Sequence, residues 1–259
     1  MPTAWSDDSR SIIFWSRQHG RSGIFRQSLT KKTADPLVTG SESLQVPRLG
    51  PDRKSVLYLQ LPRNFDPSPS VQIMRVPIDG GPAQSVLTAK GMDTHRCAPL
   101  ANLCAIGERS DDQKQLIITA LDLLKGRGRE LTRFDTNDGN GFHPWDISPD
   151  GQRIAMLYPL SGRIVIIPIS GNGQRQEFTI RNWRRLGSFD WAADGKGFFT
   201  SSITTSGAVL LHVDLRGDTR LLWEAKGRTS AWAVPSPDGR HLVISPFVIS
   251  SNIWEIEDF

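Results

Sequence analysis

The chain repeats one short turn-and-strand pattern at a regular interval. Three copies read WDISPDGQRIAM (145–156), FDWAADGKGFFT (189–200) and VPSPDGRHLVIS (234–245). The turn aspartates of five copies are separated by 44, 98, 44 and 44 residues, and they are Asp8, Asp52, Asp150, Asp194 and Asp238. The long gap is close to two periods, so a degenerate copy is expected within 95–110. A period of this length, repeated six times, is typical of propellers and other repeat folds.

The turn residues have a clear conformational role. In Ser-Pro-Asp-Gly, the proline presets φ for a type I turn and the glycine takes the positive φ that closes a hairpin. Gly151, Gly195 and Gly239 follow their turn aspartates, whereas Ser9 and Arg53 stand at this position in the first two units. Those two turns are therefore predicted either to relax to another conformation or to be strained.

Each unit is predicted to contain four antiparallel strands. Apolar residues stand four and five positions after each turn aspartate, as at Ile154 and Ala155. Consecutive apolar positions predict a strand that is covered on both faces. Later strands are expected at 23–29, 71–78, 163–170, 208–215 and 252–259, with short fourth strands at 175–180 and 219–224. No segment has sustained helical periodicity with helix caps.

These units favour an all-β fold, the β-propeller. Sheets that are apolar on both faces are buried by stacking radially against their neighbours, whereas sandwich strands have one polar face. We expect six four-stranded blades in a single domain, the last blade being incomplete because its fourth strand is absent. The approximate units are 1–42, 43–90, 91–138, 139–184, 185–228 and 229–259. The incomplete blade predicts either an imperfectly closed ring or a strand supplied by another segment, and an open strand edge favours association.

Composition indicates a globular chain and gives weak information on partners. Apolar residues make up 38% and charged residues 22%, and neither a membrane-length apolar stretch nor a signal peptide is apparent. As written, the chain is expected in the cytoplasm, or in the periplasm if it belongs to a longer membrane-anchored protein. The net charge of +4 is scattered, with its densest group at Arg181, Arg184 and Arg185. Nucleic-acid binding is therefore the weaker expectation.

Cys97 and Cys104 are the only cysteines. Their spacing permits a disulfide between two antiparallel strands, and it equally permits two small buried thiols. Both interpretations remain open. No second cysteine or histidine pair at zinc spacing accompanies them, so a zinc site is not expected.

The repeat resembles the TolB-type, WD-repeat-like β-propeller family. The resemblance rests on SPDGQRIAM (148–156), DWAADGKGFF (190–199) and SPDGRHLVIS (236–245). More narrowly, KGRGREL (125–131) and the ending SNIWEIEDF (251–259) resemble the C-terminal propellers of bacterial serine/threonine kinases and winged-helix regulators. This resemblance implies a sensor or interaction module, and the kinase and winged-helix motifs themselves are absent from the chain.

Catalytic and metal-binding motifs are not found. The sequence contains no GxSxG elbow, no HExxH and no P-loop pattern. The run DTNDGNG (135–141) has calcium-loop residues in the wrong register, because Gly139 and Asn140 stand where an oxygen ligand and a glycine are required. We therefore expect a connecting loop there, with no metal and no cofactor.

The best candidates for a ligand site lie where inner strands begin. We expect these lead-in segments to converge at one mouth of the central channel, where aromatic and arginine side chains would bind a ligand by stacking and charge-assisted hydrogen bonds. The candidate residues are His95, His143, Trp145, Arg185 and Trp232.

The sequence as a whole favours a non-enzymatic module that binds a protein or a small ligand. Two features support this hypothesis: the repeat occupies the whole chain, and catalytic motifs are missing. The alternative is a propeller-type hydrolase or polysaccharide lyase, since carboxylate pairs are plentiful.

Overall fold

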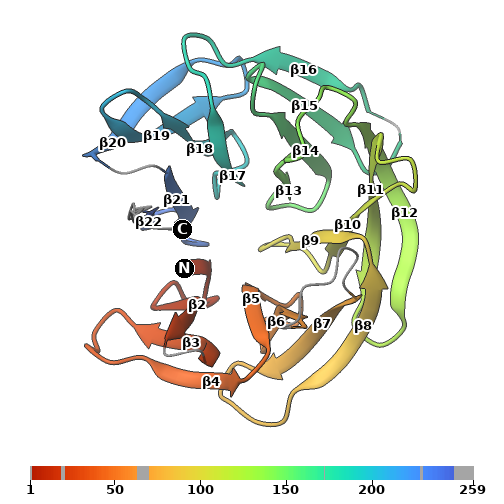
Figure 1. The fold of residues 1–259 in the computed structure, drawn as a ribbon, viewed down its shortest axis with the longest axis vertical. Coiled ribbons are helices and arrows are strands. Elements are labelled where there is room, and N and C mark those ends of the chain that lie inside the picture. The colour runs from red at the N-terminus through yellow and green to blue at the C-terminus, as the bar shows by residue number, and fades with distance from the viewer. Residues whose placement is uncertain (1, 19–20, 63–69, 172, 228–229, 248–259) are drawn as a thin grey trace, which may run out of the picture.

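The computed structural model describes residues 2–18, 21–62, 70–171, 173–227 and 230–247. Six antiparallel sheets are arranged radially around a common axis (Figure 1). The fold is an all-β propeller, and the described residues contain no α-helix. Consequently, none of them forms a helix able to cross a membrane.

Each sheet is a meander of strands consecutive in the chain. The first contains β1 (Pro2–Trp5), β2 (Ser11–Gln18), β3 (Arg21–Ser28) and β4 (Asp35–Gly40), and the second contains β5 (Ser43–Leu49), β6 (Ser55–Leu61), β7 (Ser70–Pro77) and β8 (Gln84–Lys90). The third contains β9 (Met92–Cys97), β10 (Cys104–Arg109), β11 (Gln115–Asp122) and β12 (Gly126–Asp135), and the fourth contains β13 (Trp145–Ile147), β14 (Arg153–Tyr158), β15 (Arg163–Pro168) and β16 (Gln176–Thr179). The fifth contains β17 (Leu186–Trp191), β18 (Gly197–Ile203), β19 (Gly207–Asp214) and β20 (Thr219–Lys226), and the last contains β21 (Ser230–Pro235) and β22 (Leu242–Phe247).

The degenerate unit expected within 95–110 is the hairpin of β9 and β10. The prediction of six four-stranded blades needs correction, because the described residues form five four-stranded sheets and one two-stranded sheet. The strand expected at 252–259 lies outside the described residues. The segment 135–141 contains the end of β12 and the loop that leads toward β13.

The repeated turn is held by its serine and aspartate side chains. In the fourth sheet, Ser148 Oγ donates to Asp150 Oδ1 over 2.5 Å, and Asp150 Oδ1 also accepts from the Gln152 N–H. Gly151 has a φ of 70°, and Ser9 and Arg53 adopt the same left-handed region at 58° and 57°. Of the two predicted alternatives, strain is thus the one observed at these positions.

Both strained residues contact the turn of a neighbouring unit. Arg53 Nη1 lies 2.7 Å from Asp7 Oδ1, and its Nη2 donates to the Pro99 carbonyl. Ser9 Oγ accepts from the Asp238 N–H over 3.2 Å. A glycine at either position would relieve the strain and lose these contacts between blades.

The apolar core lies between adjacent blades. Alternate residues of β14 point in opposite directions: Ala155 and Leu157 pack in a cluster with the fifth sheet, whereas Ile154 and Met156 pack in a cluster with the third. All four side chains are fully buried. Two further clusters join the first sheet to the second and the second to the third. Radial stacking therefore buries both faces of the sheets, as the consecutive apolar positions predicted.

The first and last described sheets meet directly, with β1 beside β21 (Figure 1). Trp5 Nε1 donates to the Val234 carbonyl over 2.9 Å, and the Trp5 ring stacks on His241 with centroids 5.9 Å apart. Side-chain packing and hydrogen bonds thus connect the first and last described sheets.

Cys97 and Cys104 are opposite each other in the register of β9 and β10, and the structure joins them as a disulfide. The disulfide links the inner strand of the third sheet, β9, covalently to β10. This geometry matches the first of the two interpretations that the spacing left open.

Candidate functional site

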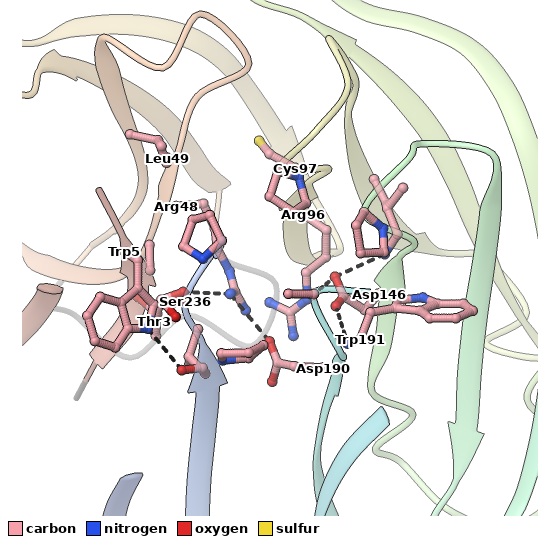
Figure 2. Close-up of a pocket in the computed structure, with 18 of the residues that line it drawn as sticks. Thr3, Trp5, Arg48, Leu49, Arg96, Cys97, Asp146, Asp190, Trp191 and Ser236 are labelled. Atoms are coloured by element: carbon pink, nitrogen blue, oxygen red, sulfur yellow. Dashed lines mark hydrogen bonds and ion pairs between the residues drawn. The ribbon is translucent and has the colours of Figure 1, made fainter. Parts of the chain in front are cut away.

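Four consecutive inner strands each place a charged residue at the same register position. Arg48 of β5, Arg96 of β9, Asp146 of β13 and Asp190 of β17 all stand opposite the residue nine positions further along the chain. In the units whose turn aspartate is present, this position is four residues before that aspartate. Because the inner strands surround the axis, their equivalent side chains meet there (Figure 2).

The four side chains form two loose ion pairs. Arg48 Nη1 lies 3.5 Å from Asp190 Oδ1, and Arg96 Nε lies 3.7 Å from Asp146 Oδ1. The side chains of the first pair are only 11% and 5% exposed, and those of the second pair 7% and 13%. Burying ions is costly unless their hydrogen bonds are satisfied, so the remaining contacts decide how this group is stabilised.

Backbone groups supply some of the hydrogen bonds that the four buried charges need. Arg48 Nη1 donates to the Thr3 carbonyl over 2.6 Å, and Arg96 Nε donates to the Trp145 carbonyl over 3.0 Å. Asp146 accepts the N–H groups of Ile147 and Trp191, each at 2.9 Å. Asp146 is therefore held by its own strand and by the next blade.

Two polar atoms of the group are left unsatisfied. Asp190 Oδ2 and Arg48 Nε are buried and have no hydrogen-bond partner among the described residues. One is an acceptor and the other a donor. A buried polar atom without a partner is costly, and such atoms are uncommon in native proteins.

Burial shifts the pKa values of this group. Burial, reinforced by the charge of Asp146, raises the pKa of Asp190 to about 6, against the opposing influence of Arg48. Burial also raises the pKa of Asp146. Burial and the positive charge of Arg96 lower the pKa of Arg48 to about 10, which leaves it charged at neutral pH.

A cavity of about 100 Å³ opens onto these four residues. Its walls are mainly apolar and aromatic, and they come from the inner strands and the turns that follow them, including Trp5, Leu49, Pro149, Trp191 and Pro237. The volume admits a few water molecules or one small polar group, and it is well below the 300 Å³ or more of a typical drug-sized ligand pocket. The cavity therefore suits the end of a side chain or of a peptide better than a whole sugar unit.

The five residues expected at a channel mouth do not line this cavity. The cavity lies at the turn end of the inner strands, whereas lead-in segments lie at the opposite end. Trp145 and His143 are fully buried, Arg185 is exposed and Trp232 is half-buried. A ligand role for these residues stays a prediction.

The surroundings of both predicted histidines are defined. His143 Nε2 lies 2.9 Å from Asp138 Oδ1, and its Nδ1 lies 3.3 Å from Arg109 Nη2. His95 precedes Arg96 and is fully buried, and neither ring nitrogen has a well-aligned hydrogen-bond partner among the described residues. Burial, followed by the charges of Arg48 and Arg96, lowers the pKa of His95 to about 3. His95 is therefore a neutral neighbour of the charged group.

The four charged residues were not expected from the sequence. The signal that would have found them is the residue four positions before each turn aspartate, which is Arg, Asp and Asp in the second, fourth and fifth units. In the third unit Leu100 replaces the turn aspartate and hides Arg96. Within the described part of the chain, no three His, Cys, Asp or Glu residues are grouped so as to hold a metal ion.

No protein-family model and no curated protein matches this chain. Among solved structures, TolB from Acinetobacter baumannii is similar with a TM-score of 0.65 and 20% identity, over 87% of this chain and 55% of that one. The putative TolB from Agrobacterium tumefaciens has a TM-score of 0.66 and 17% identity, over 95% of this chain and 89% of that one. The fold is that of a TolB-like β-propeller. This chain spans about half the length of the Acinetobacter protein.

An enzyme with a propeller domain is also structurally similar to this chain. An oligogalacturonate lyase in complex with manganese has a TM-score of 0.57 and 14% identity, over 92% of this chain and 68% of that one. Similarity at these identities shows a shared fold and no more. The narrower resemblance to kinase-linked and winged-helix-linked propellers stays a prediction.

The pKa of Asp190 leads to a pH prediction. An unfolded aspartate has a pKa near 4, and the folded value is about 6, so between these values the folded state holds an extra proton. That contribution to stability is present at the lower pH and is lost as pH rises through about 6. From pH 4.5 to pH 7, we expect the unfolding free energy of the unmodified protein, relative to that of Asp190→Asn, to fall by about 2 kcal/mol.

Urea unfolding curves of both proteins at several pH values measure this difference. Asp79→Asn, which alters an aspartate with an 84% exposed side chain, is the matched control. Its unfolding free energy should run parallel to that of the unmodified protein. A parallel curve for Asp190→Asn as well would contradict the prediction.

Proposed function

We propose that this chain is a non-catalytic binding module whose recognition site is the cavity at the turn end of the channel. The ligand is a small polar group of a partner protein, such as a side-chain carboxamide. The single observation that carries this proposal is that two arginines and two aspartates line one small cavity with mainly apolar walls. A group that offers a donor and an acceptor can hydrogen-bond to an aspartate and an arginine at once.

The balance of charge in the cavity supports this ligand class. Two arginines and two aspartates contribute no net charge, so the site offers no general attraction for a strongly anionic polymer. The apolar walls of the cavity favour burial of an aliphatic or aromatic group next to the polar group of the ligand. A peptide supplies both features, because its polar and apolar groups alternate along the chain.

Selection of random heptapeptides displayed on phage tests the proposal. Peptides selected on the unmodified protein should lose at least tenfold in affinity for Asp190→Asn and for Arg48→Lys, since each variant changes one of the charged side chains that line the cavity. Asp79→Asn, on the outer surface, should retain the affinity. Circular dichroism confirms that each variant is folded. Equal binding to all three variants would place recognition elsewhere on the protein.

A catalytic use of the same carboxylates is the competing function. A carboxyl group with a pKa near 6, beside a second carboxylate, has the protonation behaviour of a general acid or base. A structurally similar protein is an oligogalacturonate lyase. Turnover of oligogalacturonate or of a carboxylic ester, with or without manganese, that disappears in Asp190→Asn would overturn the binding-module proposal.

A further inference from the structure

A second concave surface lies at the other end of the blades. It is a groove of about 640 Å³ between the fourth and fifth sheets. Three loops form it: the β14–β15 hairpin, the β18–β19 hairpin and the segment 180–185 that joins β16 to β17. Because successive strands run in opposite directions, these loops lie away from the repeated turns and from the cavity.

The groove has an apolar floor that is open to solvent. Leu160 and Ile203, from the two hairpins, are 57% and 39% exposed. Trp183 lies beside them, half-buried, and its Nε1 donates to Thr219 Oγ1 over 3.1 Å, which fixes the indole. Exposed apolar side chains that are grouped and rimmed by charge mark an interaction site.

Three arginines stand on the loop that borders this floor. Arg184 lines the groove, and Arg181 and Arg185 flank it in sequence. All three are exposed, and within the described residues none of their side chains has an ion pair or a hydrogen bond. By contrast, Arg163 and Arg175 of the same blade both pair with Glu177. The groove therefore carries uncompensated positive charge.

The backbone holds this loop in a defined shape. Ser202 Oγ donates to the Arg184 carbonyl over 2.6 Å, and the Ile203 N–H donates to the Arg185 carbonyl over 3.4 Å. Asn182 and Arg185 both adopt left-handed φ values, 67° and 53°. Strained residues persist where surrounding contacts fix them, and a loop fixed before binding loses less entropy when a partner arrives.

We propose that this groove binds an extended acidic peptide segment of a partner protein. One aliphatic side chain of the segment packs between Leu160 and Ile203. Neighbouring carboxylates pair with the arginines of 181–185, since a guanidinium matches a carboxylate through two parallel hydrogen bonds. The groove is separate from the channel cavity, so this binding does not depend on the function proposed above.

The floor of the groove favours a peptide over a nucleic acid. Single-stranded nucleic acids bind through several aromatic side chains on which successive bases stack. Here one indole, Trp183, accompanies aliphatic side chains. Aliphatic side chains of this kind favour contact with an apolar side chain, and successive bases cannot stack on them.

Fluorescence anisotropy with defined probes tests this proposal. The first probe is a labelled nonapeptide of four glutamates, a central leucine and four glutamates, and the others are its lysine analogue, a nonaglutamate peptide and a dT15 oligonucleotide. We expect the leucine-containing glutamate peptide to bind at least threefold more tightly than nonaglutamate, and the lysine analogue not to bind. Affinity should fall as salt rises, because the paired charges are exposed.

Matched variants locate the binding surface. Arg184→Glu should weaken binding of the leucine-containing glutamate peptide at least tenfold, whereas Arg129→Glu, at an exposed arginine of β12, should change it less than twofold. Leu160→Ser should remove the preference for leucine, and Leu124→Ser, at an 89% exposed leucine elsewhere, should leave it intact. Thermal unfolding checks that each variant is folded.

Three results would overturn the proposal. One is an equal loss of affinity in Arg184→Glu and Arg129→Glu, which would indicate unspecific charge attraction. Another is tighter binding of dT15 than of the leucine-containing glutamate peptide, which would indicate a nucleic-acid surface. The third is the absence of binding by that peptide at low salt.

Discussion

Arg48→Met should lower the free energy of unfolding by about 3–5 kcal/mol at pH 7. The substitution removes a positive charge next to Asp190, whose side chain is 5% exposed. It also removes the donor that satisfies the Thr3 carbonyl. The Asp190 carboxyl group would then have to stay ionised without its partner or take up a proton, and either change costs free energy. Removal of one member of a buried ion pair is costly for this reason, whatever the net contribution of the pair.

A second variant and a second pH value separate this cause from a simple packing defect. Arg48→Met combined with Asp190→Leu should recover most of the lost stability, because no unpaired charge remains. At pH 5 the cost of Arg48→Met alone should shrink, because Asp190 then takes up a proton. Arg26→Met, which breaks an exposed pair with Asp79, should cost less than about 1 kcal/mol. Urea unfolding followed by circular dichroism gives all four values, and equal costs for Arg48→Met and Arg26→Met would contradict the argument.

Trp145→Ala should lower the free energy of unfolding by a similar amount, about 3–5 kcal/mol. Trp145 is fully buried in the cluster between the third and fourth sheets. Gly107 of the adjacent blade leaves room for the indole, since a Cβ there would lie 2.7 Å from Trp145 Nε1. An alanine would leave a large cavity between two rigid sheets that cannot close it.

A more conservative substitution and a surface control test whether Trp145 is a core residue. Trp145→Phe should retain much of the stability, because a large apolar side chain still fills the space. Phe142→Ala, at a 44% exposed aromatic residue nearby in the chain, should change stability by less than about 1 kcal/mol. Circular dichroism is the suitable probe, because tryptophan fluorescence changes with the substitution itself. A cost below about 1 kcal/mol for Trp145→Ala would show that Trp145 is not a core residue.

The candidate site shows why a pattern in the sequence can be present and still be missed. Turn and strand residues recur in most units, since every blade needs the same tight turn followed by a buried strand. By contrast, the residue four positions before the turn aspartate differs between units. In chain order it is Ala4, Arg48, Asp146, Asp190 and Val234. A search for residues that are similar in all units therefore does not identify this position. A comparison for systematic difference at one register position would have selected these residues.

The histidines and the tryptophan at the starts of the inner strands show a second limit of the sequence, because their burial could not be predicted from it. Polar and aromatic residues near a predicted channel were natural ligand candidates, yet His143 and Trp145 are fully buried between blades. Burial depends on how closely the blades pack at that level of the channel. One blade's sequence carries no information on the space that its neighbour leaves, such as the space beside Gly107.

By itself, the sequence determined the repeat, the turn chemistry and the need to cover both faces of each sheet, because these follow from local backbone preferences and short-range apolar patterning. It also identified Ser9 and Arg53 as the turn positions without glycine, and the structure shows that both are left-handed. Only the tertiary structure decided that Arg48, Arg96, Asp146 and Asp190 meet, that Cys97 joins Cys104, and that the cavity opens at the turn end. The disulfide depends on the register of β9 and β10. The charged group and the cavity depend on distances between strands far apart in the chain, which are fixed only when the blades stack around the axis.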